Sequence, residues 1–397
     1  MALRAIRRLT DAAIVLKRGA RGCVIFPHAI PTSLEDGIVC RGFAVEVFNV
    51  VGAGDGFMSG FLYGWLHDEP WETCGRLGNA CGALVVSRHG CSPASPTHRE
   101  LEWFLANDAL RSDLYRDPEL AFIHRATTRR RRPASLRVVG CDIDPTVTSE
   151  HWRSGRTPSR FQVLAATALA GAGHAPNTGM LVDARHGLDA LYALGSTLEW
   201  IGKRIDVGST PPLQLDEGQP AGVTLTYWPR HLIACCRVPR AAGTAAAVQS
   251  ERLRELFLAC QHHGHELLLE PTGFTGAITS ADLETRIDEL LEGGVRPDWW
   301  LVPWVHDPEG LEAIAAAVVH RDRYCRGILL ADPAHAGRGG AEAPSLPQHP
   351  LFSGFVLRQR VASLAGDWLC GKLDDSTLQH ALCQLLSSAT EQWALVA

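Results

Sequence analysis

The stretch Asn49-Val50-Val51-Gly52-Ala53-Gly54-Asp55-Gly56 joins an extended run to a helical pattern. Before it, Phe43–Phe48 places a small residue and a charged residue, Ala44 and Glu46, between large apolar ones, and this alternation predicts a strand. After it, Gly56–Leu66 carries a helical pattern in which glycine recurs at four-residue spacing, leaving one bare face for close packing. A strand that feeds a helix through a glycine turn predicts an α/β fold.

The glycine turn has the composition of an anion site. The backbone N–H groups of Gly52, Ala53 and Gly54 are expected to converge at the positive end of a helix that starts near Asp55. A phosphate fits such a site, and the Asp55 carboxylate could take the proton of an attacking hydroxyl group. The alternative is structural: Asp55 is a helix N-cap, and the glycines only form a tight turn.

The flanking segments extend the same pattern. Ala13–Leu16 and Cys23–Phe26 are short β-rich runs on either side of the turn Gly19–Gly22. Trp71–Ser87 predicts a second helix. The first hundred residues therefore read as one α/β segment.

A charged, polar run from His124 to Pro133, with four consecutive arginines, separates two regions of clear apolar periodicity. Such a run predicts an exposed linker, and its alternative is a basic patch for nucleic acid or targeting. We expect a first segment at 1–105, a connecting region with an arginine-rich linker at 106–134, and a second domain at 135–397.

The second domain contains apolar runs of strand length at intervals that leave room for helices. Eight strands that alternate with helices predict a (β/α)8 barrel of the TIM type, and an open doubly wound sheet is the alternative. The eight runs are Val138–Asp142, Met180–Asp183, Leu198–Gly202, Leu232–Val238, Glu266–Glu270, Trp299–Trp304, Gly327–Ala331 and Gly354–Leu357.

Composition narrows the functional classes. The chain has 397 residues, a formal net charge of -5 and 46% hydrophobic residues, so neither a disordered chain nor a nucleic-acid or membrane binder is expected. Without an apolar stretch long enough for a signal or a span, the expected location is cytoplasmic. The 12 cysteines lack metal-ligand spacing and are expected to be reduced and mostly buried.

From about Ile14 to Leu105 the chain resembles the C-terminal third of the ribokinase-like (PfkB) carbohydrate kinases, whose Gly-Ala-Gly-Asp signature stands here at Gly52–Asp55. Within the family it is similar to kinases of myo-inositol catabolism, through Asn49–Val51 and Ser87–Cys91. The resemblance implies an ATP- and Mg²⁺-dependent phosphotransferase that acts on a sugar acid.

The resemblance also assigns residue roles. It implies that Asp55 is the catalytic base, that the amides of the glycine turn form the anion hole, and that Gly22 and Asn79 lie on the nucleotide side. Gly22 could instead belong to a hairpin turn, and Asn79 could be a helix-surface amide. The family's N-terminal part, which supplies most of the sugar pocket, has no counterpart in the resembling segment, so a truncated kinase with negligible activity alone is expected.

Residues from about Leu136 to Ala397 resemble the aldolase-like barrel that follows the kinase in some proteins of inositol catabolism, notably at Gly179–Gly187, His265–Glu270 and Pro297–Trp300. Barrel chemistry occupies the carboxyl ends of the strands. The candidates there could bind a divalent ion or relay protons, or could be loop caps and solvated ion pairs; they are Asp142, Asp144, Asp183, Arg185, Glu270 and Asp332.

Only Lys17, Lys203 and Lys372 are lysines, and neither lysine of the barrel is expected where a Schiff-base amine would be needed. No metal site is expected either, because no histidine joins these carboxylates at ligand spacing. The alternative function is therefore a non-catalytic barrel for binding or oligomerisation, with a vestigial kinase segment; whether the chain forms homo-oligomers stays open.

Overall fold

The computed structural model describes residues 2–107, 112–129, 135–142, 155–171, 177–195, 197–198, 200–206, 211–215, 220–332 and 347–394, and side chains up to 387. The chain divides into two compact units, Met1–Arg130 and Arg131–Ala397. Residues 130–134, which include most of the arginine run, lie outside the described residues.

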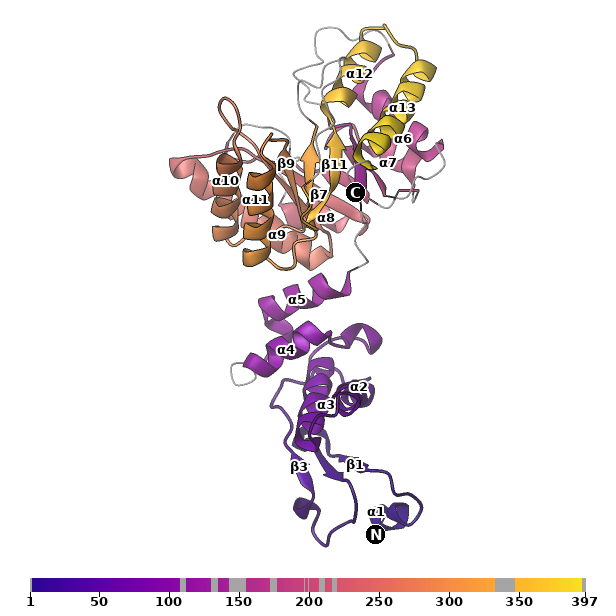
Figure 1. The fold of residues 1–397 in the computed structure, drawn as a ribbon, viewed down its shortest axis with the longest axis vertical. Coiled ribbons are helices and arrows are strands. Elements are labelled where there is room, and N and C mark those ends of the chain that lie inside the picture. Colours follow the sequence, from indigo (N-terminus) through magenta and orange to yellow (C-terminus); the bar gives the residue numbers. More distant parts are fainter. Residues whose placement is uncertain are drawn as a thin grey trace. The chain divides into compact units, whose positions relative to one another are not determined.

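Unit 1 begins with a small antiparallel sheet in the order β1-β2-β3 (Figure 1). After helix α1 (Ala2–Arg7), β1 (Ile14–Lys17) pairs with β2 (Cys23–Phe26), and β2 pairs with β3 (Ile38–Cys40). The four residues of β2 are buried, because β2 is the central strand. Short 3-10 turns, Gly19–Arg21 and Leu34–Asp36, lie in the two connections.

The prediction of a strand at Phe43–Phe48 is wrong. The segment is irregular, and its backbone bonds go elsewhere: Glu46 N donates to Ser112 O, and Phe48 N donates to Val86 O. Phe43 and Val45 pack against a cluster of buried helix residues, so one side of the segment is apolar without belonging to a sheet. The alternating pattern indicates that one side of the segment is buried, and this holds for an extended loop as well as for a strand.

Two helices confirm the expected helical segments and pack closely together. Helix α2 runs from Ala53 to Leu66, starting earlier than expected, and α3 runs from Trp71 to Val86. A Cβ added at Gly60 would come within 2.5 Å of Leu77 O, and one added at Gly64 within 3.1 Å of Cys74 Cα. The glycines of α2 therefore let the two helix backbones approach, as their spacing predicts.

Helices α4 (His98–Asn107) and α5 (Pro118–Thr128) belong to unit 1. Leu101, Phe104 and Leu120 are buried in one cluster with Leu84 of α3. The described part of the region expected to connect the domains, residues 112–129, thus folds onto the first unit, with 3-10 turns at Ser92–Ala94 and Leu114–Arg116.

A buried ion network fastens these helices to the loop after α3. Arg88 pairs with Glu100, and His124 Nδ1 lies 3.0 Å from both Glu100 carboxylate oxygens. Burial by itself would raise the pKa of Glu100, but the His124 hydrogen bond and the Arg88 charge outweigh burial and lower it. The carboxylate is therefore held ionised inside the unit.

Unit 2 is a closed barrel of eight parallel strands in the order β10-β11-β4-β5-β6-β7-β8-β9. All eight expected strands are confirmed, and the closure rules out the open doubly wound sheet. The strands are β4 (Leu136–Gly140), β5 (Thr178–Val182), β6 (Trp200–Arg204), β7 (Leu232–Val238), β8 (Leu267–Pro271), β9 (Trp299–Pro303), β10 (Gly327–Ala331) and β11 (Phe352–Leu357).

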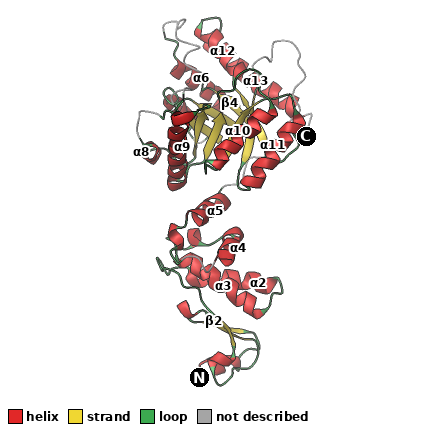
Figure 2. Cartoon of the chain, turned by 90° about the vertical axis from the view of Figure 1, so that its left-hand side faces the viewer, coloured by secondary structure: helices red, strands yellow, loops and turns green. Residues whose placement is uncertain are grey.

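Helices surround these strands (Figure 2). Large side chains such as Trp200, Trp299 and Leu301 fill the barrel interior, and a second cluster lies between the strands and the helices around Trp368. The helices are α6 (Pro158–Gly171), α7 (Leu188–Leu194), α8 (Ala221–Thr226), α9 (Gly243–His263), α10 (Ser280–Glu292), α11 (Pro308–Arg321), α12 (Gln359–Leu369) and α13 (Asp375–Ala394).

Within the described residues, no helix is both long and apolar enough to cross a membrane. All 12 cysteines are free thiols, and most are buried, as the sequence predicts.

Candidate functional site

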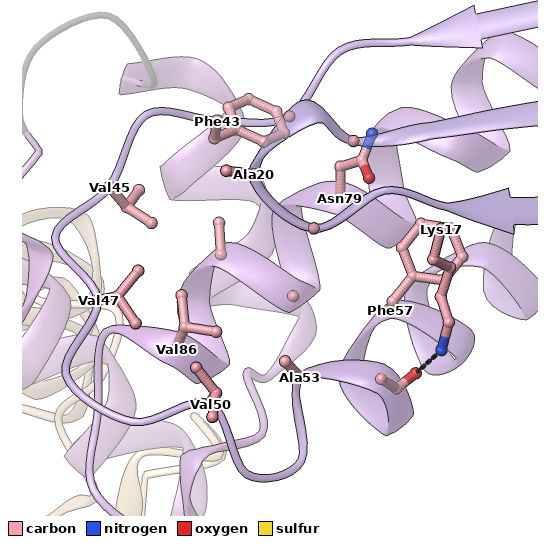
Figure 3. A pocket seen from close by; sticks show the side chains of 16 residues that line it. Lys17, Ala20, Phe43, Val45, Val47, Val50, Ala53, Phe57, Asn79 and Val86 are labelled. Atoms are coloured by element: carbon pink, nitrogen blue, oxygen red, sulfur yellow. Dashed lines mark hydrogen bonds between the residues drawn. The ribbon is translucent and has the colours of Figure 1, made fainter.

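A cavity of about 380 Å³ lies in unit 1 beside the glycine turn. Its lining comes from the β1–β2 turn, the segment after β3, the start of α2 and one side of α3 (Figure 3). Ala53, Gly54, Gly22 and Asn79, all singled out from the sequence, line it together. Apolar walls with a few polar groups are typical of a small-molecule pocket.

The turn into α2 requires glycine at position 52. Gly52 is the N-cap residue with φ 85°, and a Cβ there would come 2.6 Å from Cys91 Sγ. Asn49 holds the approach to this turn: Val51 N donates to its Oδ1, and its Nδ2 donates to Gly90 O at 3.0 Å. The turn and the loop after α3 therefore form one rigid corner.

Asp55 lies in the first turn of α2, and its side chain is not the N-cap of the helix, so the capping alternative is wrong. Gly56 N is already bonded to Gly52 O, and Ala53 N donates to Val50 O at 3.3 Å. The amides of Gly52, Gly54 and Asp55 belong to the donors at the helix start that have no intrahelical acceptor. Asp55 is exposed, and no partner of its carboxylate is found among the described residues.

Lys17 is a cavity residue that sequence reasoning did not assign to the site. Its Nζ lies 3.5 Å from Gly54 O and 5.7 Å from the centre of the Phe57 ring (Figure 3). This places a cation at the turn whose amides would hold an anion. The scarcity of lysine in the chain was the signal that could have pointed to it.

Two glycines make the far side of the cavity. Gly22 has φ +83°, and a Cβ there would lie 2.1 Å from Cys40 O; a Cβ at Gly42 would lie 2.4 Å from Ala20 O. The backbones of the β1–β2 turn and the post-β3 segment are therefore in direct contact. Asn79 secures the same place, since its Nδ2 donates to Cys40 O at 3.0 Å and also to Arg41 O.

In the barrel, the carboxyl ends of four strands carry a buried ion network. Arg204 Nε donates to Asp142 Oδ2 at 2.7 Å, and Arg204 also pairs with Glu270. Arg358 Nη2 lies 3.0 Å from Asp142 Oδ2 and 3.1 Å from Glu270 Oε2. The structure thus brings Asp142 and Glu270 together, and two arginines neutralise them.

The arginines set the protonation of this network. Burial by itself would raise the pKa of Glu270, but the charges of Arg204 and Arg358 outweigh burial and lower the pKa to about 2. Beside it, Asp206 accepts from Arg237 Nε at 2.9 Å and lies 3.9 Å from Arg204 Nη1. Glu270 is therefore held ionised, and all three carboxylates at this end are paired with arginines.

The remaining barrel candidates have local partners. Asp183 accepts from the backbone N–H groups of Arg185 and His186 and from Gln162 Nε2, which is the pattern of a loop cap. Asp332 accepts from three backbone N–H groups that begin at Arg358. Arg185 is exposed, and Asp144 lies outside the described residues.

The lysines of the barrel do not offer a Schiff-base amine at this mouth. Lys203 Nζ lies 4.4 Å from the centre of the Trp228 ring, and Lys372 Nζ pairs with Asp367 at 2.9 Å. In the part of the chain that the structure describes, no group of three or more His, Cys, Asp or Glu side chains is arranged to hold a metal ion.

Two family models match the chain, one after the other. Residues 100–396 match the family described as "Uncharacterized protein conserved in bacteria (DUF2090)". The chain belongs to this family. Residues 2–98 match the pfkB family carbohydrate kinase, so the kinase-like part is the N-terminal part of this chain. The border between the matches falls at the start of α4, inside unit 1.

Curated relatives match the kinase-like part. The 5-dehydro-2-deoxygluconokinase of Listeria monocytogenes is 34% identical over 93 residues, which are 23% of this chain and 27% of the relative. That of Listeria innocua is 35% identical over 94 residues, 24% of this chain and 27% of the relative. The chain thus spans about a quarter of the length of these relatives.

Solved structures are similar to this chain at low identity. A fructose-bisphosphate aldolase from Slackia heliotrinireducens gives a TM-score of 0.41 at 11% identity, over 67% of this chain and 89% of that one. A protein of Corynebacterium glutamicum gives 0.40 at 13% identity, over 74% and 98%. The assignment of the barrel rests on its closed strand order.

Proposed function

We propose that unit 1 supplies the nucleotide side and the base of an ATP-dependent sugar kinase, and that it corresponds to the C-terminal part of a PfkB domain. The observation that carries the proposal is the Gly52–Asp55 turn, which opens α2 beside the glycine-lined cavity. Its support is the match of this segment to the carbohydrate kinase model and to curated kinases.

In the proposed reaction Asp55 removes the proton from a substrate hydroxyl group. The hydroxyl oxygen forms a bond to the γ-phosphorus of ATP while the bond from that phosphorus to the ADP oxygen breaks. The Gly54 and Asp55 amides and the Lys17 ammonium group stabilise the negative charge that builds up on the phosphoryl oxygens. The exposed position of Asp55 leaves room for a substrate hydroxyl at its carboxylate.

The proposed substrate is 5-dehydro-2-deoxygluconate, a sugar acid of myo-inositol catabolism, because the curated relatives are named for it. Mg²⁺ would accompany the ATP phosphates and lessen their charge. The described residues show no group of metal ligands of their own, so no step is assigned to the ion. A cytoplasmic location, where ATP and free thiols coexist, is part of the proposal.

The test separates binding from catalysis. ATP should bind the full chain, and Asp55→Asn should keep that binding within about twofold, because the carboxylate acts on the hydroxyl group rather than on the nucleotide. Where turnover is reconstituted, Asp55→Asn should lower it by about 10²–10⁴. Near-normal turnover in the variant would remove Asp55 as the base, and absent ATP binding in calorimetry would refute the nucleotide site.

A second function for unit 2 is favoured by the barrel mouth. Asp142 and Glu270 are neutralised by Arg204 and Arg358 and are therefore not available as metal ligands or proton carriers. We propose that the barrel serves as a binding or oligomerisation module. Concentration-dependent mass measured by light scattering tests self-association, and a monomer at every concentration would exclude the oligomerisation role.

A further inference from the structure

Helix α2 exposes large apolar side chains beside its two exposed polar residues, Asp55 and Ser59. Phe57 and Phe61 are buried together with Cys74 of α3 on one side. Yet Met58, Leu62, Trp65 and Leu66 are exposed by 38, 41, 51 and 70%. Their spacing of four, three and one residues places them on one stripe, which we call the open face. A helix that is buried on one side and still exposes a stripe of large apolar residues has a second surface suited to packing.

The neighbouring sheet also has an uncovered edge. β1 pairs with β2 on one side, and within the described residues no strand pairs with its other side. Ile14, Val15 and Leu16 are only half-buried, whereas all four residues of β2 are buried. Edges of natural sheets are usually short, charged or covered, and an apolar edge marks a place where another strand can add.

The length of the relatives indicates what covers these surfaces. The aligned segment makes up 27% of the Listeria kinase, so about three quarters of a domain of that family has no counterpart in the match. A domain of this kind folds around one core, and a quarter of it exposes the apolar surface that the remainder would bury. The open face and the β1 edge are surfaces of that kind.

We infer that the open face and the β1 edge form the docking surface for the complementary part of a PfkB kinase domain. This inference rests on the proposed function. β1 ends at Lys17 and α2 begins two residues before Asp55, so the docked part would border the two charged groups of the site. That part would then supply the side chains that hold the sugar next to Asp55.

The experiment uses the full chain and, as a separate tagged polypeptide, the part of the Listeria monocytogenes kinase that precedes its matched segment. The two should co-purify as a complex of equal stoichiometry in size exclusion with light scattering. Leu62→Glu with Leu66→Glu should lower the recovered complex at least about tenfold, because interface centres tolerate buried charge poorly. Leu188→Glu, at a leucine of α7 whose exposure lies between those of Leu62 and Leu66, should leave recovery unchanged.

Other outcomes overturn the inference, and the last of them separates it from the proposed function. Absence of a complex, or equal recovery with the double variant, removes the docking surface. A wild-type chain that is dimeric alone and becomes monomeric in the double variant assigns the open face to a second copy. A lowered melting temperature of the isolated double variant shows that the face is already covered within the chain. A complex that forms but transfers no phosphate refutes the proposed kinase function and keeps the docking surface.

Discussion

Arg204 is buried among three carboxylates, and its replacement by methionine should destabilise the barrel strongly. The variant leaves Asp142 and Glu270 with Arg358 as their counter-ion, and it leaves Asp206 with Arg237. Removing one member of a buried ion network typically costs about 3–5 kcal/mol. The lowering of the Glu270 pKa from 4.5 to about 2 is worth about 3 kcal/mol at about 1.36 kcal/mol per pKa unit, which is of the same order.

The pH dependence follows from the same residue. Glu270 has a lowered pKa in the folded chain, so the stability it contributes is complete above about pH 4.5 and is lost as the pH falls toward about 2. The deficit of Arg204→Met should therefore be full at pH 7 and shrink at pH 4. Urea unfolding of the full chain, followed by fluorescence of the buried Trp200 and Trp299, measures this.

Two further variants keep the test sharp. Arg204→Met combined with Glu270→Gln should recover part of the loss, since it removes an uncompensated charge, whereas lost packing of the arginine stem would not be recovered. Arg185→Met, at an exposed arginine, should stay within about 0.5 kcal/mol of wild type. If Arg204→Met does not fold, Arg358→Met replaces it. A loss under about 1 kcal/mol, or one unchanged between pH 7 and pH 4, refutes the network as a source of stability.

Two other predictions concern unit 1. Gly22→Ala should markedly lower ATP affinity and stability, because its Cβ would lie 2.1 Å from Cys40 O. Gly19→Ala in the same turn, with φ +62° and open space around its Cβ, should cost only about 1–2 kcal/mol in stability. Calorimetry and thermal melts compare the two variants, and equal effects would contradict the close approach at Gly22. Glu100→Gln should destabilise unit 1 by about 3 kcal/mol at pH 7, because Arg88 loses its counter-ion. The loss should be smaller below pH 4.5, because the pKa of Glu100 is lowered in the folded chain and the stability that it contributes is lost as the pH falls. Denaturant melts at pH 7 and below pH 4.5 measure the difference, and a loss that does not depend on pH would indicate a packing effect.

The strands of the barrel were predictable because each is a short apolar run, buried on both faces, between helical segments. Phe43–Phe48 was not, because alternation records which side is buried and not whether a neighbouring strand is bonded. At the mouth, the sequence indicated Asp142 and Glu270 from their places at strand ends. Their pairing with Arg204 depends on strands far apart in the sequence coming together in the closed barrel, which no local pattern encodes.

The ion pair between Arg88 and Glu100 joins residues that two different family models claim, since one match ends at 98 and the other begins at 100. Helix α5 and nearly all of α4 fall within the family match that also covers the barrel, yet they complete the core of the kinase-like unit. A gene divided at the family border would therefore encode a kinase-like part without the two helices that complete its core. The barrel part would carry these helices with their apolar side chains exposed. A division that keeps both folded units intact has to fall after α5, about thirty residues downstream of the border between the two family matches.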